Sequence, residues 1–270
     1  GANPFVQIQA VQLLREITAA NWLRHYAIAT ERKLLAIKPI SDRFADSVME
    51  FSIQGHPFTA RVTASIDGDR LFFLLNLALT STYPKYEEIF GVPVVSFNLQ
   101  KISGKPSIEN RLSYNLNDII RFTYPESWKY RAVTEKHPKG RKAVDLFSFD
   151  PDGNLCGRMR VKAVDKKFSS GVEEQIQDTL SEYKDGNVIV DDLLESVEVE
   201  IGSDRFDTGV VKAFSAHIEE NEIRQEVWVA VIEDPKYYMV VSLLTPFREE
   251  GFYLWAINRR AYDIVLETLA

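Results

Sequence analysis

Basic side chains occupy every second position of one apolar stretch, at Arg158, Arg160 and Lys162. Because successive side chains of a β-strand point to opposite faces, this spacing predicts a strand with a cationic face and an apolar core face. Lys139 and Arg141, in the segment just before this strand, extend its basic character. These five residues are our candidate docking site for an acidic partner.

Three interpretations of this basic surface are open. In the first, it is a solvated strand face neutralised by Asp145 or by an acidic helix predicted over residues 173–182. In the second it docks an acidic protein or lipid headgroups, and in the third it binds nucleic acid. The net charge of −7 and the scarcity of aromatic residues in the basic segment disfavour nucleic acid. The expected partner is therefore an acidic protein or a membrane surface.

Other residues that could do chemistry are scattered along the chain. The four histidines (His25, His56, His137 and His217) lie in different predicted elements, and none has a second ligand at a metal-binding spacing. A single cysteine, Cys156, excludes an intramolecular disulfide and a cysteine-based zinc site. The sequence has no nucleophile elbow and no phosphate-binding loop. We predict no catalytic, cofactor-binding or metal-binding residues, which favours a non-enzymatic role.

The chain contains an internal repeat. The tetrapeptide Ser-Asp-Arg-Phe occurs at residues 41–44 and again at 203–206, and a Phe-Ser pair follows each copy, at 51–52 and 214–215. Ordered matches of this kind indicate a duplicated folding unit. Apolar runs bounded by turn residues then predict an antiparallel meander of three strands in each half, over 48–53, 58–66 and 70–80 and over 210–218, 223–232 and 237–245.

Helices are predicted where apolar residues recur at helical spacing. Phe5, Ile8, Val11, Leu14 and Ile17 stand three residues apart and predict an amphipathic helix over residues 5–20. Two further helices are predicted over 172–183 and 252–269. The expected fold class is α+β, with two related repeats that each form an antiparallel meander sheet packed by helices.

The second half of the chain resembles a known fold. The residues Phe122-Thr123-Tyr124-Pro125-Glu126-Ser127-Trp128, followed by a hairpin, a helix, a meander and a closing helix, resemble the PsbP-like family. This resemblance implies an α/β/α sandwich, with a complete domain at 118–270 and a partial copy at 1–100. The residues between them, 101–117, are rich in Ser, Asn, Gly and Pro and are predicted to be a linker. Members of the family are mostly non-catalytic assembly factors and adaptors, so the resemblance implies no catalytic residues.

Together these features predict a non-enzymatic binding or accessory protein that acts through a protein-interaction surface. One alternative is a carrier of a small apolar ligand or lipid, with a cavity lined by Phe72, Phe73, Tyr237 and Tyr238. Another is an enzyme whose site forms between the repeats. The small residues that open the sequence suggest a removed signal peptide and hence a bacterial periplasmic or secreted protein, with a cytoplasmic location as the alternative. No apolar run is long enough to span a bilayer.

Overall fold

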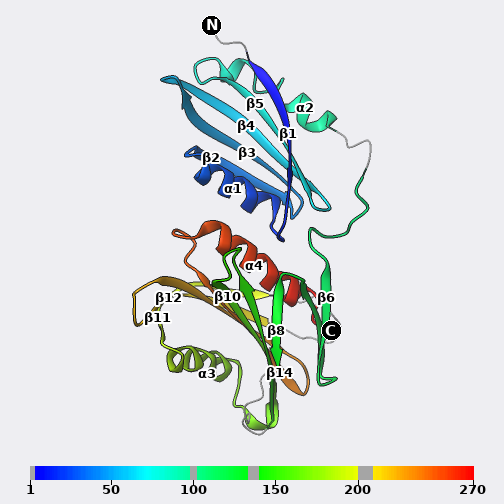
Figure 1. Cartoon of the computed structure of the whole chain (residues 1–270), viewed down its shortest axis with the longest axis vertical. Coiled ribbons are helices and arrows are strands. Elements are labelled where there is room, and N and C mark those ends of the chain that lie inside the picture. The colour runs from blue at the N-terminus through cyan, green and yellow to red at the C-terminus, as the bar shows by residue number, and fades with distance from the viewer. Residues whose placement is uncertain (1–3, 98–101, 133–139, 200–208) are drawn as a thin grey trace. The chain divides into compact units, whose positions relative to one another are not determined.

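The computed structural model describes residues 4–97, 102–132, 140–199 and 209–270, which belong to two compact units (Figure 1). Unit 1 is Gly1–Glu109 and unit 2 is Asn110–Ala270. Each unit is built on an antiparallel sheet with helices packed against it, so the fold class is α+β, as predicted. The division falls within residues 101–117, the predicted linker, where the structure also has a short strand.

Unit 1 is a five-stranded sheet with the order β1-β5-β4-β3-β2. Its elements are β1 (Phe5–Gln12), α1 (Ala19–Ala29), β2 (Lys33–Ser41), β3 (Phe44–Ile53), β4 (His56–Asp67), β5 (Arg70–Leu79), the short 3-10 helix η1 (Tyr83–Lys85) and α2 (Gly91–Ser96). Helix α1 covers one face of the sheet, where Trp22 and Tyr26 pack against Phe73. On the other face, Ala78 packs with Tyr83 and Phe90.

The predicted helix over residues 5–20 is wrong, because Phe5–Gln12 is the strand β1 and helix α1 begins only at Ala19. Residues 5–12 fit both a helix and a strand. Apolar residues recur at every third position, as on a helix, and also at every second position, at Val6, Ile8 and Ala10, as on a strand. Pairing with β5 along the whole of β1 decides in favour of the strand. The Thr18 side chain then accepts a hydrogen bond from the backbone N–H of Asn21 and caps α1.

Unit 2 has a seven-stranded sheet with the order β11-β12-β13-β14-β10-β9-β8, and a separate two-stranded sheet β6-β7. Its elements are β6 (Arg111–Leu116), β7 (Ile120–Pro125), β8 (Trp128–Ala132), β9 (Arg141–Phe149), β10 (Leu155–Asp165), the 3-10 helix η2 (Lys166–Phe168), α3 (Val172–Asp185), β11 (Val188–Val199), β12 (Gly209–Ile218), β13 (Arg224–Glu233), β14 (Tyr237–Pro246) and α4 (Phe252–Glu267). The predicted strands and the helices α3 and α4 are confirmed to within a few residues.

Helices α3 and α4 cover opposite faces of the large sheet (Figure 1). Ile176 of α3 belongs to one core with Val227 and Val229 of β13. Trp228, which lies between these two valines and therefore points the other way, packs against Tyr262 of α4. Unit 2 is thus a three-layered α/β/α sandwich.

The two units share a strand order. In each, a strand leads to a helix and then to a four-stranded meander, and the last meander strand pairs antiparallel with the strand before the helix: β1 with β5, and β10 with β14. The two Phe-Ser pairs fall on corresponding strands, β3 and β12. This arrangement is compatible with the predicted duplication. The first Ser-Asp-Arg-Phe forms the β2–β3 turn, and the second lies outside the described residues.

Candidate functional site

The structure places Arg158, Arg160 and Lys162 on the face of β10 that α3 covers, with Met159 and Val161 fully buried on the opposite face. This alternation follows from the geometry of the strand. Helix α3 contributes acidic side chains toward the same face, and strand β9 contributes Asp145, so the basic row lies among carboxylates.

Arg160 is the centre of this network. Its guanidinium donates to both carboxylate oxygens of Asp145, at 2.6 and 2.8 Å, and to Oε2 of Glu182 at 3.2 Å. The hydrogen bonds to Asp145 raise the pKa of Arg160 above its ordinary value, against the opposing effect of burial. The charge of Arg160 is therefore fully engaged inside the unit.

Lys162 is buried, with 4% of its surface exposed. Its Nζ donates to Oγ1 of Thr179 at 2.9 Å and to Oε1 of Glu182 at 3.0 Å, both on α3. Loss of solvent lowers the pKa of Lys162, while the Glu182 carboxylate opposes that shift. A buried ammonium with these partners ties β10 to α3 and is closed to an external ligand.

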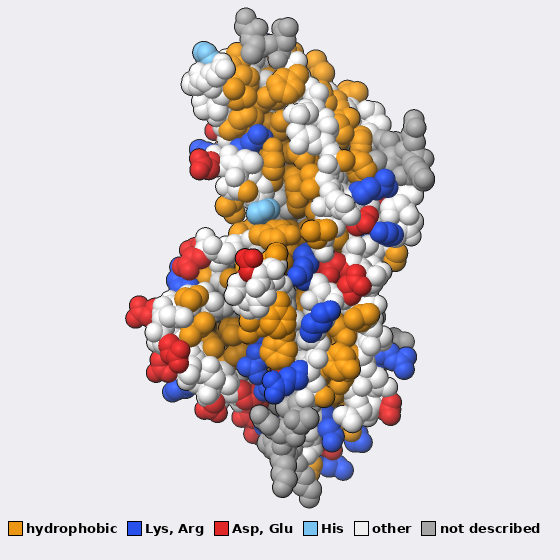
Figure 2. Space-filling model, in the orientation of Figure 1, with side chains coloured by type: hydrophobic (Ala, Val, Ile, Leu, Met, Phe, Trp, Pro, Cys, Tyr) orange, Lys and Arg blue, Asp and Glu red, His pale blue; other side chains and the backbone are white. Residues whose placement is uncertain are grey.

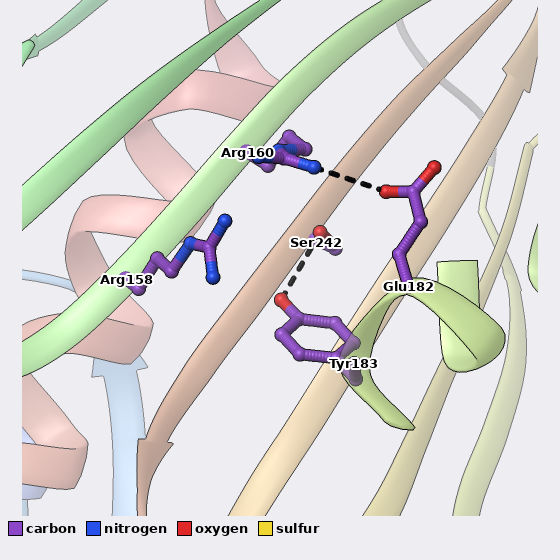
Figure 3. Close-up of a pocket in the computed structure, with 5 residues that line it drawn as sticks. All are labelled: Arg158, Arg160, Glu182, Tyr183 and Ser242. Atoms are coloured by element: carbon purple, nitrogen blue, oxygen red, sulfur yellow. Dashed lines mark hydrogen bonds and ion pairs between the residues drawn. The ribbon is translucent and has the colours of Figure 1, made fainter. Parts of the chain in front are cut away.

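Arg158 is held more loosely than its neighbours. Its one described ion pair joins Nη2 to Oδ2 of Asp145 at 3.4 Å, and 35% of its side chain is exposed. Figure 3 shows its guanidinium directed into a hollow that Tyr183 and Ser242 also line. The hollow holds about 10 Å³, which is room for roughly one water molecule.

The Tyr183 hydroxyl at the floor of this hollow donates to Oγ of Ser242 at 3.1 Å (Figure 3). Burial raises the pKa of Tyr183 to about 12, so the phenol stays protonated and neutral. A space of this size excludes a metabolite, since sites for small molecules enclose about 300 Å³ or more. The hollow fits a single atom or the tip of a small polar group.

Arg141, the fourth basic residue of the network, pairs with Asp178 and lies 3.9 Å from Glu182. Lys139, the fifth candidate residue, lies outside the described residues. Among the side chains joined by ion pairs here, four are basic and three are acidic: Arg141, Arg158, Arg160 and Lys162 with Asp145, Asp178 and Glu182. The contacts with Asp145 and α3 match the neutralised-face interpretation, and one positive charge is in excess.

A second polar cluster was not foreseen from the sequence. Glu226 of β13 is fully buried on the α4 face and accepts hydrogen bonds from Nε1 of Trp228 at 3.0 Å and of Trp255 at 2.8 Å. The guanidinium of Arg248 donates to both its oxygens, at 2.6 and 2.9 Å, and stacks over both indoles. The available signal was the position of Glu226, two residues before Trp228 and therefore on the same strand face.

Among the described residues, the remaining candidates do not assemble into a reactive centre. His217 pairs with Asp191 at 2.9 Å between Nδ1 and Oδ2, and His56 opens β4 after the β3–β4 turn. His137 falls outside the described residues. Across the described part of the chain, no three His, Cys, Asp or Glu side chains gather as they would around a metal ion.

The residues predicted to line an apolar cavity do not face one common space. Phe72 and Phe73 are adjacent on β5 and point to opposite faces, where Phe72 packs on Phe97 and Phe73 on α1. Tyr238 belongs to the α3-side core of unit 2. In the described residues, no helix has the length and apolar character that a membrane crossing requires.

No protein-family model matches the sequence, and no curated protein matches it either. Among solved structures, cyanobacterial PsbP (CyanoP) from Synechocystis sp. PCC 6803 is 13% identical, with a TM-score of 0.43, covering 63% of this chain and 98% of that one. The immunity protein TplEi of T6SS from Pseudomonas aeruginosa is 10% identical, with a TM-score of 0.31 and coverages of 98% and 90%. The Tle4-Tli4 complex gives 9% identity, a TM-score of 0.29 and coverages of 99% and 91%. The chain is similar to PsbP in fold, as its sequence predicted, and these likenesses concern the fold alone.

Proposed function

We propose that this chain is a binding protein and that Arg158 of unit 2 docks a carboxylate of an acidic protein partner. The observation that carries the proposal is the unequal network between β9, β10 and α3, where four basic side chains share three carboxylates. The excess charge falls on Arg158, because Arg160 and Lys162 have close partners within the unit and Arg158 has one at 3.4 Å.

The geometry of the hollow favours a carboxylate over a larger anion. The space beside Arg158 accepts a group of about the size of one water molecule. One carboxylate oxygen fits this space, where the Arg158 guanidinium can donate a charge-assisted hydrogen bond to it. A lipid phosphate, with its bulkier tetrahedral headgroup, fits the same space less well.

The test compares Arg158→Gln with Lys184→Gln, which removes the same charge from an exposed position of α3. A fluorescent oligoglutamate peptide serves as the probe, and its affinity is measured by anisotropy at low and at physiological salt. We expect Arg158→Gln to weaken binding at least ~10-fold, the lower end of what a hydrogen bond to a charged group contributes, and Lys184→Gln to leave binding unchanged. Equal effects of both substitutions would mean that only net charge matters, and the proposal would fail.

A second arm uses vesicles containing phosphatidylserine in place of the peptide. Vesicle binding that depends on Arg158, without peptide binding, would assign the site to lipid headgroups and overturn the protein partner. The melting temperature of Arg158→Gln should equal that of the wild type, because this side chain is partly exposed and weakly paired. The expected export of the protein stays a prediction, which fractionation of cells carrying the full-length gene would check.

A further inference from the structure

We propose that two copies of this chain pair antiparallel along β1 and join their unit 1 sheets into one continuous sheet. The contact concerns unit 1 and is independent of the site at Arg158. Strand β1 forms one edge of the unit 1 sheet (Figure 1). Hydrophobic side chains gather in this region of unit 1 in Figure 2. Phe5, Val6 and Ile8 are 46%, 47% and 57% exposed.

Strand β1 lacks the features that keep edge strands apart. Natural edges carry charges, proline or bulges, because a bare edge offers unpaired backbone groups to another chain. The eight residues of β1 include no charge and no proline, and their pairing with β5 runs without a bulge. By this criterion β1 is an exposed pairing surface.

The other three edges of the two large sheets are protected. Strand β2 carries Lys33, Lys38 and Pro39 and two irregularities in its register. Strand β11 is acidic and also breaks register twice, and the short β8 carries Lys129 and Arg131. Pairing any of these strands with its own copy would bring like charges together, which is unfavourable. Only for β1, among these four edges, is self-pairing free of charge repulsion.

The backbone of β1 shows which groups a second strand would meet. The N–H of Leu13 donates to the carbonyl of Asp69 at 2.7 Å. The backbone N–H and C=O groups of the odd-numbered residues of β1 therefore point toward β5. Because hydrogen-bonding groups alternate along an antiparallel pair, Val6, Ile8, Ala10 and Gln12 direct their N–H and C=O groups away from the sheet. These outward groups would form the ladder with the second copy.

A two-fold axis at Gln9 makes the β1 sequence self-complementary. Val6 of one copy then lies opposite Gln12 of the other, and Ile8 lies opposite Ala10, while Gln9 faces itself. The pairs are apolar or uncharged, so the side chains favour the same contact as the backbone. Such an interface is isologous and closes at two copies. The joined sheet would end at both sides in β2, whose lysines and proline stop further addition.

The experiment measures the mass of the full chain by sedimentation and light scattering between about 1 and 200 µM. We expect a concentration-dependent dimer for the wild type. Ile8→Lys places a charge opposite Ala10 twice in each dimer and should weaken association at least ~10-fold. Leu14→Lys is the matched control, because Leu14 is 75% exposed and lies beyond the end of β1. This control should dimerise like the wild type.

Ala10→Pro supplies a second variant, since it removes an outward N–H and leaves the bonds to β5 in place. Hydrogen exchange adds an independent measurement: the amides of Val6, Ile8, Ala10 and Gln12 should become protected as concentration rises, while that of Leu13 stays protected throughout. A wild type that is monomeric at 200 µM overturns the proposal. So does a dimer that survives Ile8→Lys, or one that Leu14→Lys disrupts equally.

Discussion

Replacing Glu226 with alanine should strongly destabilise unit 2. The carboxylate is fully buried and accepts from two indole N–H groups, from the Arg248 guanidinium and from the Arg248 backbone N–H at 3.2 Å. Without it, the indoles of Trp228 and Trp255 lose their acceptor in the core, at about 1–3 kcal/mol for each unsatisfied donor. The Arg248 side chain is 35% exposed and can turn to water, so the loss of its hydrogen bonds to Glu226 costs less free energy.

We therefore expect Glu226→Ala to lower the free energy of unfolding by about 4 kcal/mol, the range found when one partner of a buried ion pair is removed. With a urea slope of about 2 kcal/mol per M, the midpoint of unfolding falls by about 2 M. Glu226→Gln keeps the volume and one acceptor oxygen but loses the charge, so its effect should be roughly half as large.

The assay must separate the two units. In a Trp22→Phe background, the remaining tryptophans (Trp128, Trp228 and Trp255) all lie in unit 2, so their fluorescence follows that unit alone. Glu249→Ala is the control, since its carboxylate is exposed and 3.7 Å from Arg224; it should change stability by less than ~0.5 kcal/mol. A Glu226→Ala midpoint within ~0.5 M of the parent would refute the reasoning.

Two further predictions concern close packing and pH. A Cβ on Gly157 would lie 2.7 Å from Nδ2 of Asn258, which donates to the Cys156 carbonyl at 2.6 Å and cannot retreat freely. Gly157→Ala should therefore cost about 2 kcal/mol in urea unfolding, whereas Gly91→Ala, whose nearest neighbour is at 3.5 Å, should change stability little. Burial lowers the pKa of His25 below 6.5, so the unfolded chain takes up the proton first as pH falls. Unit 1 should lose stability below about pH 6.5, and His25→Gln should melt with a shallower pH dependence between about pH 7.5 and 5.5; parallel curves would contradict this.

The elements with long, regular patterns were predictable from the sequence. The central meander strands are long apolar runs bounded by turn residues, and helix α3 combines an apolar stripe with acidic residues in its first turn. Residues Phe5–Gln12 satisfied two periods at once, and the choice was made by β5, which is far away in sequence. Local pattern alone could not identify β1 as a strand or as a sheet edge.

The basic residues of β10 were also predictable only in part. The spacing correctly placed Arg158, Arg160 and Lys162 on one strand face, and an acidic helix was weighed as their neighbour. Which lysine or arginine is covered depends on where Glu182 and Thr179 fall along α3, and this is set by tertiary packing. For Glu226 the partners Trp255 and Arg248 lie beyond the following strand, so no local signal pairs them.

Both proposed surfaces are places where the fold leaves a strong interacting group incompletely matched. On β10, the Glu182 carboxylate of α3 serves Arg160 and Lys162, and Arg158 is left with a single long contact to Asp145. In the unit 1 sheet, β5 satisfies one side of β1 and leaves the backbone groups of Val6, Ile8, Ala10 and Gln12 directed outward. The two kinds of group call for different partners, a carboxylate in one case and an extended backbone in the other. Arg158→Gln should therefore leave self-association unchanged, and Ile8→Lys should leave oligoglutamate binding unchanged, so that failure of one proposal does not imply failure of the other.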